Sequence, residues 1–145
     1  MSKVEKAAHL FKQGFSCSQA VLAACGEGLG VEEEKLLKIS SGFGAGMGRM
    51  GEVCGAVTGA FMAIGLKHGR GKLEDQAAKE KTQQLVSEFA KRFKARHRTV
   101  ICRDLLGCDL STAAGIKIAL EKNLFTTLCP KFVSSAAEIL GEIME

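Results

Sequence analysis

Residues 53–66 read VCGAVTGAFMAIGL, and this stretch predicts the centre of the fold. Every side chain in it is apolar or small, and Gly55, Gly59 and Ala63 are spaced so that a helix would place them on one face. Small residues on one face let neighbouring helices approach closely. A membrane-spanning helix needs about 20 apolar residues, more than this stretch offers. The stretch therefore predicts a buried central helix rather than a membrane span.

Outward from this segment, apolar residues recur with the period of amphipathic helices. These helices are predicted over 4–13, 16–25, 31–39, about 73–98, 111–123 and from 129 onward. The chain has only one proline and no tyrosine or tryptophan, a composition that favours helices over a turn-rich sheet protein. We expect an all-α fold, a compact bundle of about five to seven helices in a single domain covering residues 1–145.

Several helix starts carry recognisable capping signals. Ser16 and Gln19 form a capping box, which places Cys17 in the first turn of the helix over 16–25. Ser111 is the expected cap of the helix over 111–123. Proline is favoured at the first helical position, so Pro130 predicts that Cys129 is the cap residue of the last helix.

Composition and charge narrow the classes of function. Hydrophobic residues make up 46% of the chain and charged residues 25%, so a real core is expected. The net charge of +4 is small and both signs are interspersed, so no nucleic-acid partner is predicted, and the basic run over 91–98 is interpreted as a solvated helix end. The first residues lack the pattern of a secretory signal, which predicts a cytoplasmic protein.

A glycine-rich loop lies directly before the central stretch. Residues 42–51 contain five glycines and predict an irregular backbone or a close approach to another group. The glycines at 46, 48 and 51 resemble a dinucleotide fingerprint in spacing alone. Because no apolar strand precedes them, nucleotide binding is not favoured.

The six cysteines are the residues most able to carry chemistry. In an intracellular chain, cysteines favour thiol or metal chemistry over a structural disulfide framework. Cys17, Cys54 and Cys129 fall at or near predicted helix N-termini, where free amides and the helix dipole stabilise a thiolate. No Cys-x-x-Cys motif is present, so any site must be assembled by the fold. Cys25 and Cys108 are interpreted as ordinary small hydrophobic residues.

The residues themselves resemble a known family. Cys54 to Gly59, read as CGAVTG, matches the CGAxxG signature of the C_GCAxxG_C_C family of redox-active proteins, and the flanking glycine loop is similar too. The resemblance spans nearly the whole chain and implies four shared cysteines, which correspond to Cys17, Cys54, Cys102 and Cys129. Cys25 and Cys108 are then extra. The family implies redox activity but no defined substrate or reaction, and so leaves open whether the chain is an enzyme.

Three functions remain open at this point. The leading hypothesis is thiol–disulfide exchange or electron transfer, with Cys54 and Cys17 as the reactive thiolates, Cys102 and Cys129 as a second pair, and an unknown redox partner. The alternative is an iron–sulfur cluster or zinc ion held by the same four thiolates, since four cysteines match either ligand count. His68 could add a metal ligand if the central helix ended near the cysteines. The third reading is a non-catalytic helical interaction module.

Overall fold

A computed structural model describes residues 1–144, and it confirms the all-α fold. Within these residues the only β-type pairing is an isolated bridge between Val53 and Ile101. The principal helices are α1 (Lys3–Gln13), α2 (Cys17–Cys25), α3 (Glu33–Ser40), α5 (Gly55–His68), α6 (Gln76–His97), α7 (Cys102–Leu106), α8 (Ala113–Glu121) and α10 (Cys129–Ile143). The single turns α4 (Gly44–Met47) and α9 (Leu124–Thr127) and a 3-10 turn (Ser41–Phe43) complete the order. The described chain thus has more helices than the five to seven expected.

Helix α5 is the buried centre that the sequence predicts. Most of its residues from Gly55 to Ile64 are buried, and α2 packs closely along it. A Cβ atom on Gly59 would lie 2.7 Å from the carbonyl oxygen of Ser18 in α2, so only glycine allows this approach. Within residues 1–144 no helix is long and apolar enough to cross a membrane.

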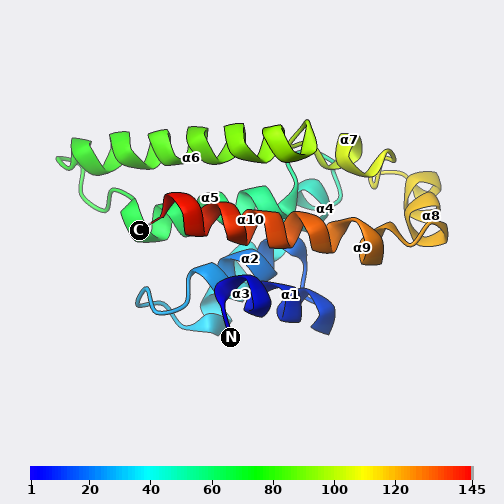
Figure 1. Cartoon of the computed structure of the whole chain (residues 1–145), viewed down its shortest axis with the longest axis horizontal. Coiled ribbons are helices and arrows are strands. Elements are labelled where there is room, and N and C mark those ends of the chain that lie inside the picture. The colour runs from blue at the N-terminus through cyan, green and yellow to red at the C-terminus, as the bar shows by residue number, and fades with distance from the viewer. Residues whose placement is uncertain (145) are drawn as a thin grey trace.

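The helices lie in layers on either side of α5. Figure 1 shows the long helix α6 along one side of the molecule, α1 and α3 on the other, and α10 running between them. Helix α6 buries only Phe89 and Phe93 completely, and its remaining residues are exposed or half-buried, as its charged sequence predicts. The ring centroids of Phe89 and Phe93 are 6.0 Å apart, and those of Phe93 and Phe132 from α10 are 6.3 Å apart.

The helix starts follow the predicted capping signals in part. The capping box of Ser16 and Gln19 is present and begins α2 at Cys17, as predicted. The prediction that Ser111 caps the next helix is wrong, because the side chain of Thr112 accepts a hydrogen bond from the amide of Gly115. Helix α8 therefore starts one residue later than expected. Ser111 instead donates its hydroxyl to Asp109. The prediction that Cys129 is the cap residue of the last helix is wrong by one position, because Leu128 occupies the cap position and Cys129 is the first residue of α10.

The glycine-rich loop forms a left-handed turn. Every residue from Ala45 to Arg49 has a φ between 57° and 71°, which is the left-handed region that residues other than glycine rarely adopt. The amide of Gly48 donates to the carbonyl of Gly44 at 3.0 Å and closes the turn. The prediction of an irregular backbone between residues 42 and 51 is therefore confirmed.

Candidate functional site

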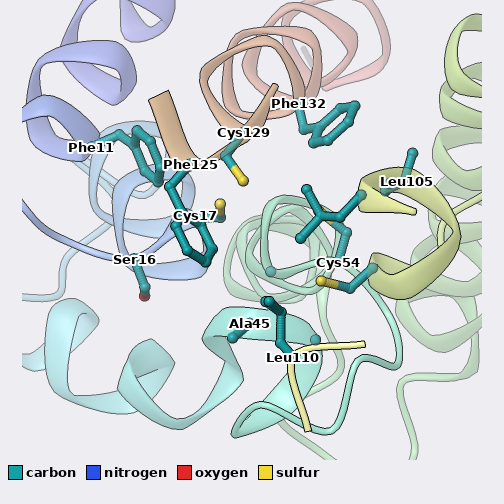
Figure 2. A pocket seen from close by; sticks show the side chains of 14 residues that line it. Phe11, Ser16, Cys17, Ala45, Cys54, Leu105, Leu110, Phe125, Cys129 and Phe132 are labelled. Atoms are coloured by element: carbon teal, nitrogen blue, oxygen red, sulfur yellow. The ribbon is translucent and has the colours of Figure 1, made fainter. Parts of the chain in front are cut away.

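The four candidate cysteines line one cavity of about 180 Å³. It is formed where the first turns of α2, α5, α7 and α10 meet, and Figure 2 shows it from close by. The lining residues are Phe11, Ser16, Cys17, Ala45, Gly46, Cys54, Gly55, Cys102, Leu105, Leu106, Leu110, Phe125, Cys129 and Phe132. The fold thus brings together cysteines that are up to 112 positions apart in the sequence, counted from Cys17 to Cys129.

Each of the four cysteines is placed by the start of a helix. Cys17 and Cys129 are the first residues of α2 and α10, and Cys54 is the cap residue of α5. Cys102 begins α7, and its amide donates to the carbonyl of Glu52 at 2.6 Å. Sequence reasoning predicted three of these helix starts and missed that of Cys102.

Glycines allow the backbone to come close to two of the sulfur-bearing side chains. A Cβ atom on Gly46, inside the left-handed turn, would lie 2.8 Å from the Cβ of Cys102. A Cβ atom on Gly55 would lie 3.2 Å from the Cβ of Cys17. The first of these distances is closer than real Cβ contacts, and the second leaves almost no room. The glycines of the loop and of the central helix therefore shape the surroundings of the thiols as well as helix packing.

The thiols of Cys17 and Cys129 interact directly. Their sulfur atoms point toward one another in the cavity (Figure 2). The neighbouring Cys129 raises the pKa of Cys17 well above its ordinary value, and the neighbouring Cys17 lowers the pKa of Cys129. Burial adds to the rise at Cys17 and opposes the fall at Cys129. Cys129 is consequently the thiol of this pair that loses its proton more readily.

Burial controls the protonation of the other two cysteines. It raises the pKa of Cys54 to about 12, although the amides of Ala56 and Val57 at the start of α5 favour the thiolate. Burial likewise raises the pKa of Cys102 to about 12, and the neighbouring cysteines add to that rise. The neighbouring Cys129 and burial raise the pKa of Cys17, and burial raises that of Cys54, although both residues lie at helix N-termini, where free amides favour the thiolate.

The two extra cysteines lie outside the lining of this cavity. Cys25, at the far end of α2, is buried, and burial raises the pKa of its thiol to about 11. Cys108 follows α7 and is also buried, with a pKa raised by the same cause.

The histidines stand apart from the thiol cavity. His68 ends α5 while Cys54 begins it, so about 20 Å of helix separates them and His68 is not placed to join the cysteines at a metal. His97 is half-buried rather than fully exposed. Its ring packs 4.7 Å from that of Phe93 between centroids, and its Nε2 lies 2.9 Å from the Ser135 hydroxyl.

The fit of a metal ion to the four cysteines can be judged from their spacing. Among residues 1–144, no group of three or more histidine, cysteine, aspartate or glutamate side chains is arranged so that it could hold a metal ion. The four thiols line one cavity, but in this conformation they do not form a three- or four-ligand set. Binding of zinc or an iron–sulfur cluster would require these side chains to move together.

Comparison with known proteins gives one match. A protein-family model described as "Putative redox-active protein (C_GCAxxG_C_C)" matches residues 15–143, a range that includes all six cysteines. No curated protein and no solved structure matches the chain.

Proposed function

The chain belongs to the C_GCAxxG_C_C family, and we propose that it acts by thiol–disulfide exchange through Cys17 and Cys129. The observation that carries this proposal is that the sulfur atoms of these two cysteines face each other inside an otherwise apolar cavity. Exchange needs a thiolate and a second sulfur within reach of it. The pair supplies both, because Cys129 holds its proton less tightly and Cys17 lies against it.

The proposed reaction consists of two successive thiolate attacks. The Cys129 thiolate attacks one sulfur of a partner disulfide, which breaks the partner S–S bond and forms a mixed disulfide on Cys129. The released thiolate takes the proton of Cys17. The Cys17 thiolate then attacks the Cys129 sulfur, forms the Cys17–Cys129 disulfide and releases the second partner thiolate, which takes a proton from water. The protein pair is oxidised by two electrons and the partner disulfide is reduced to two thiols.

Cys54 and Cys102 have a different place in this proposal. Both are buried on the same cavity and hold their protons firmly near neutral pH. We assign them to a second step, in which one of these thiols attacks the Cys17–Cys129 disulfide, forms a new disulfide with one of its two sulfurs and passes its proton to the other, which is released as a thiol. This assignment exchanges the roles expected from sequence, where Cys129 was in the second pair and Cys54 was a primary thiolate.

The test is to oxidise anaerobically purified protein with diamide and to map its disulfides by mass spectrometry under non-reducing conditions. We expect a Cys17–Cys129 bond in most chains, reversed by dithiothreitol. Cys17→Ala or Cys129→Ala should abolish this bond, and Cys25→Ala should keep it because Cys25 lies outside the cavity. Failure of the wild-type protein to form the bond, with six unreacted thiols, would support the interaction module instead.

The iron–sulfur or zinc alternative has one observation in its favour, the shared cavity of Cys17, Cys54, Cys102 and Cys129. Their spacing within the described chain argues against it. The same purified protein decides between the two functions by its metal content. One zinc or one cluster per chain, with all four thiols protected from alkylation until the metal is removed, would replace exchange by metal binding.

A further inference from the structure

The inside of the thiol cavity offers no partner to a charged ligand. None of its fourteen lining residues is charged, and most are aromatic, aliphatic or cysteine. The one hydroxyl among them, that of Ser16, already bonds Ser18 and Gln19 at 3.1 and 3.2 Å. A charged group brought into such a cavity loses its hydration without compensation, which costs several kcal/mol.

The cavity is also small. A dry cavity of about 150 Å³ holds a molecule of the size of benzene, and this one measures about 180 Å³. A disulfide with two or three heavy atoms on each side fits that space. Glutathione disulfide, with two charged tripeptides, does not fit and would have to reach the thiols from outside.

An outer groove adjoins the cavity. It is a separate space of about 710 Å³ between α1 and α9, and Phe11, Ser16 and Phe125 line both it and the cavity. Figure 2 shows Phe11 and Phe125 on the same side of the cavity as Cys17. Cys17 is half-buried, whereas Cys54, Cys102 and Cys129 are buried. These two aromatic side chains therefore lie between the outer groove and the thiols.

From the size, the uncharged lining and the aromatic side chains at the groove, we propose that the disulfide reduced at this site is a small uncharged molecule that enters the cavity past Phe11 and Phe125. This inference rests on the proposed exchange between Cys17 and Cys129. In the reaction, one molecule of disulfide gives two small thiols while the protein pair becomes a disulfide.

The first test compares diethyl disulfide with dithiodiglycolate, which also has two carbons on each side but ends in two carboxylates. The formation rate of the Cys17–Cys129 bond is measured with each, and each rate is divided by that of the same disulfide with dithiothreitol, which removes the difference in intrinsic reactivity. We expect a normalised preference of about tenfold or more for diethyl disulfide, because the cavity cannot solvate a charge. Equal normalised rates would overturn the inference.

The second test widens the access with Phe125→Ala and measures the rate with glutathione disulfide. We expect that rate to rise about tenfold or more, because a large aromatic barrier is removed, and the preference for the small disulfide to fall. Phe15→Ala is the matched control, since Phe15 lines the outer groove but not the cavity. Circular dichroism and urea unfolding confirm that both variants are folded. An equal rise in both variants would overturn the role of Phe125.

The outcomes separate this inference from the function on which it rests. If diamide joins Cys17 to Cys129 but glutathione disulfide does so as fast as diethyl disulfide in the normalised comparison, exchange stands and the inference fails. If neither disulfide nor diamide joins the two cysteines, the proposed function fails and the inference fails with it.

Discussion

Two apolar regions meet along α10 and are built in opposite ways. On one side, Phe89 and Phe93 are completely buried and stack on each other, and the ring of Phe93 packs at a tilt against that of Phe132. Phe132 also lines the thiol cavity, where phenylalanine and leucine side chains leave space next to four cysteines and to the glycines at positions 46 and 55. Large side chains fill the first region and give it its stability, whereas the second region keeps space free beside its sulfur atoms. Stability and chemistry are thus separated within one core.

The difference in packing between the two regions is tested most directly by removing one phenylalanine from each. Phe89→Ala should lower the free energy of unfolding by about 3 to 5 kcal/mol, because it leaves a cavity in a close-packed core. Phe125→Ala should cost about 1 kcal/mol, since Phe125 is half-buried beside space that is already open. Urea unfolding measures both. Similar costs for the two variants would show that the thiol region is packed as tightly as the aromatic one.

The protonation of the thiols is tested by alkylation with iodoacetamide as a function of pH. The pKa of Cys129 is lowered from 9.0 and that of Cys54 is raised to about 12. A lowered pKa means that the thiolate forms at lower pH, so labelling of Cys129 should reach half of its maximal rate below pH 9, while labelling of Cys54 should still be rising well above that pH. At pH 8 we expect Cys129 to react at least about a hundredfold faster.

Peptide mass spectrometry quantifies each cysteine in the same sample, and urea-unfolded protein is the control in which the two rates should converge. Faster labelling of Cys54 than of Cys129 in the folded protein at pH 8 would reverse the proposed roles.

The boundary of the cavity is tested by Gly46→Ala. Gly46 has a φ of +68°, and its new Cβ atom would lie 2.6 Å from the amide nitrogen of Glu52. Strain of this kind should cost about 2 kcal/mol of stability. Gly65→Ala is the matched control, because Gly65 lies in α5 with free space around its Cβ position and alanine should stabilise the helix by about 1 kcal/mol. Thermal unfolding compares them, and a neutral Gly46→Ala would contradict the described turn.

The smallest effect is expected at the rim of the aromatic region. Arg96 of α6 bonds Glu138 and Glu142 of α10 at 3.0 and 2.7 Å, but these side chains are partly exposed. Arg96→Ala should therefore cost less than about 1 kcal/mol, and the loss should shrink in high salt. Urea unfolding at low and high salt measures it. A large loss that salt does not change would mean that Arg96 acts through packing rather than charge.

The sequence predicts the main helices well, and it misses the short elements, of which α7 bears on the site, for a physical reason. Helix α5 and the start of α2 follow from the small-residue spacing and from the capping box of Ser16 and Gln19. Helix α7 has only five residues, too few to show an apolar period, so its start at Cys102 could not be predicted.

The candidate site could be predicted only in its parts. The family resemblance and the helix starts pointed to Cys17, Cys54, Cys102 and Cys129, and all four line one cavity. Their convergence depends on how four helices pack, which no local pattern encodes. The order of their pKa values could not be predicted from the sequence either, because the burial of the thiols and the proximity of Cys17 to Cys129 arise only in the folded chain.

The left-handed turn reverses an ordinary rule of substitution. In a right-handed helix, alanine is better than glycine, but the backbone from Ala45 to Arg49 follows nearly the mirror image of that geometry. Glycine has no handedness and fits either form, whereas Ala45, Met47 and Arg49 carry the cost of the wrong hand. The rim of the thiol cavity is thus a place where the chirality of the amino acids works against the fold, and where a less bulky residue is the better fit.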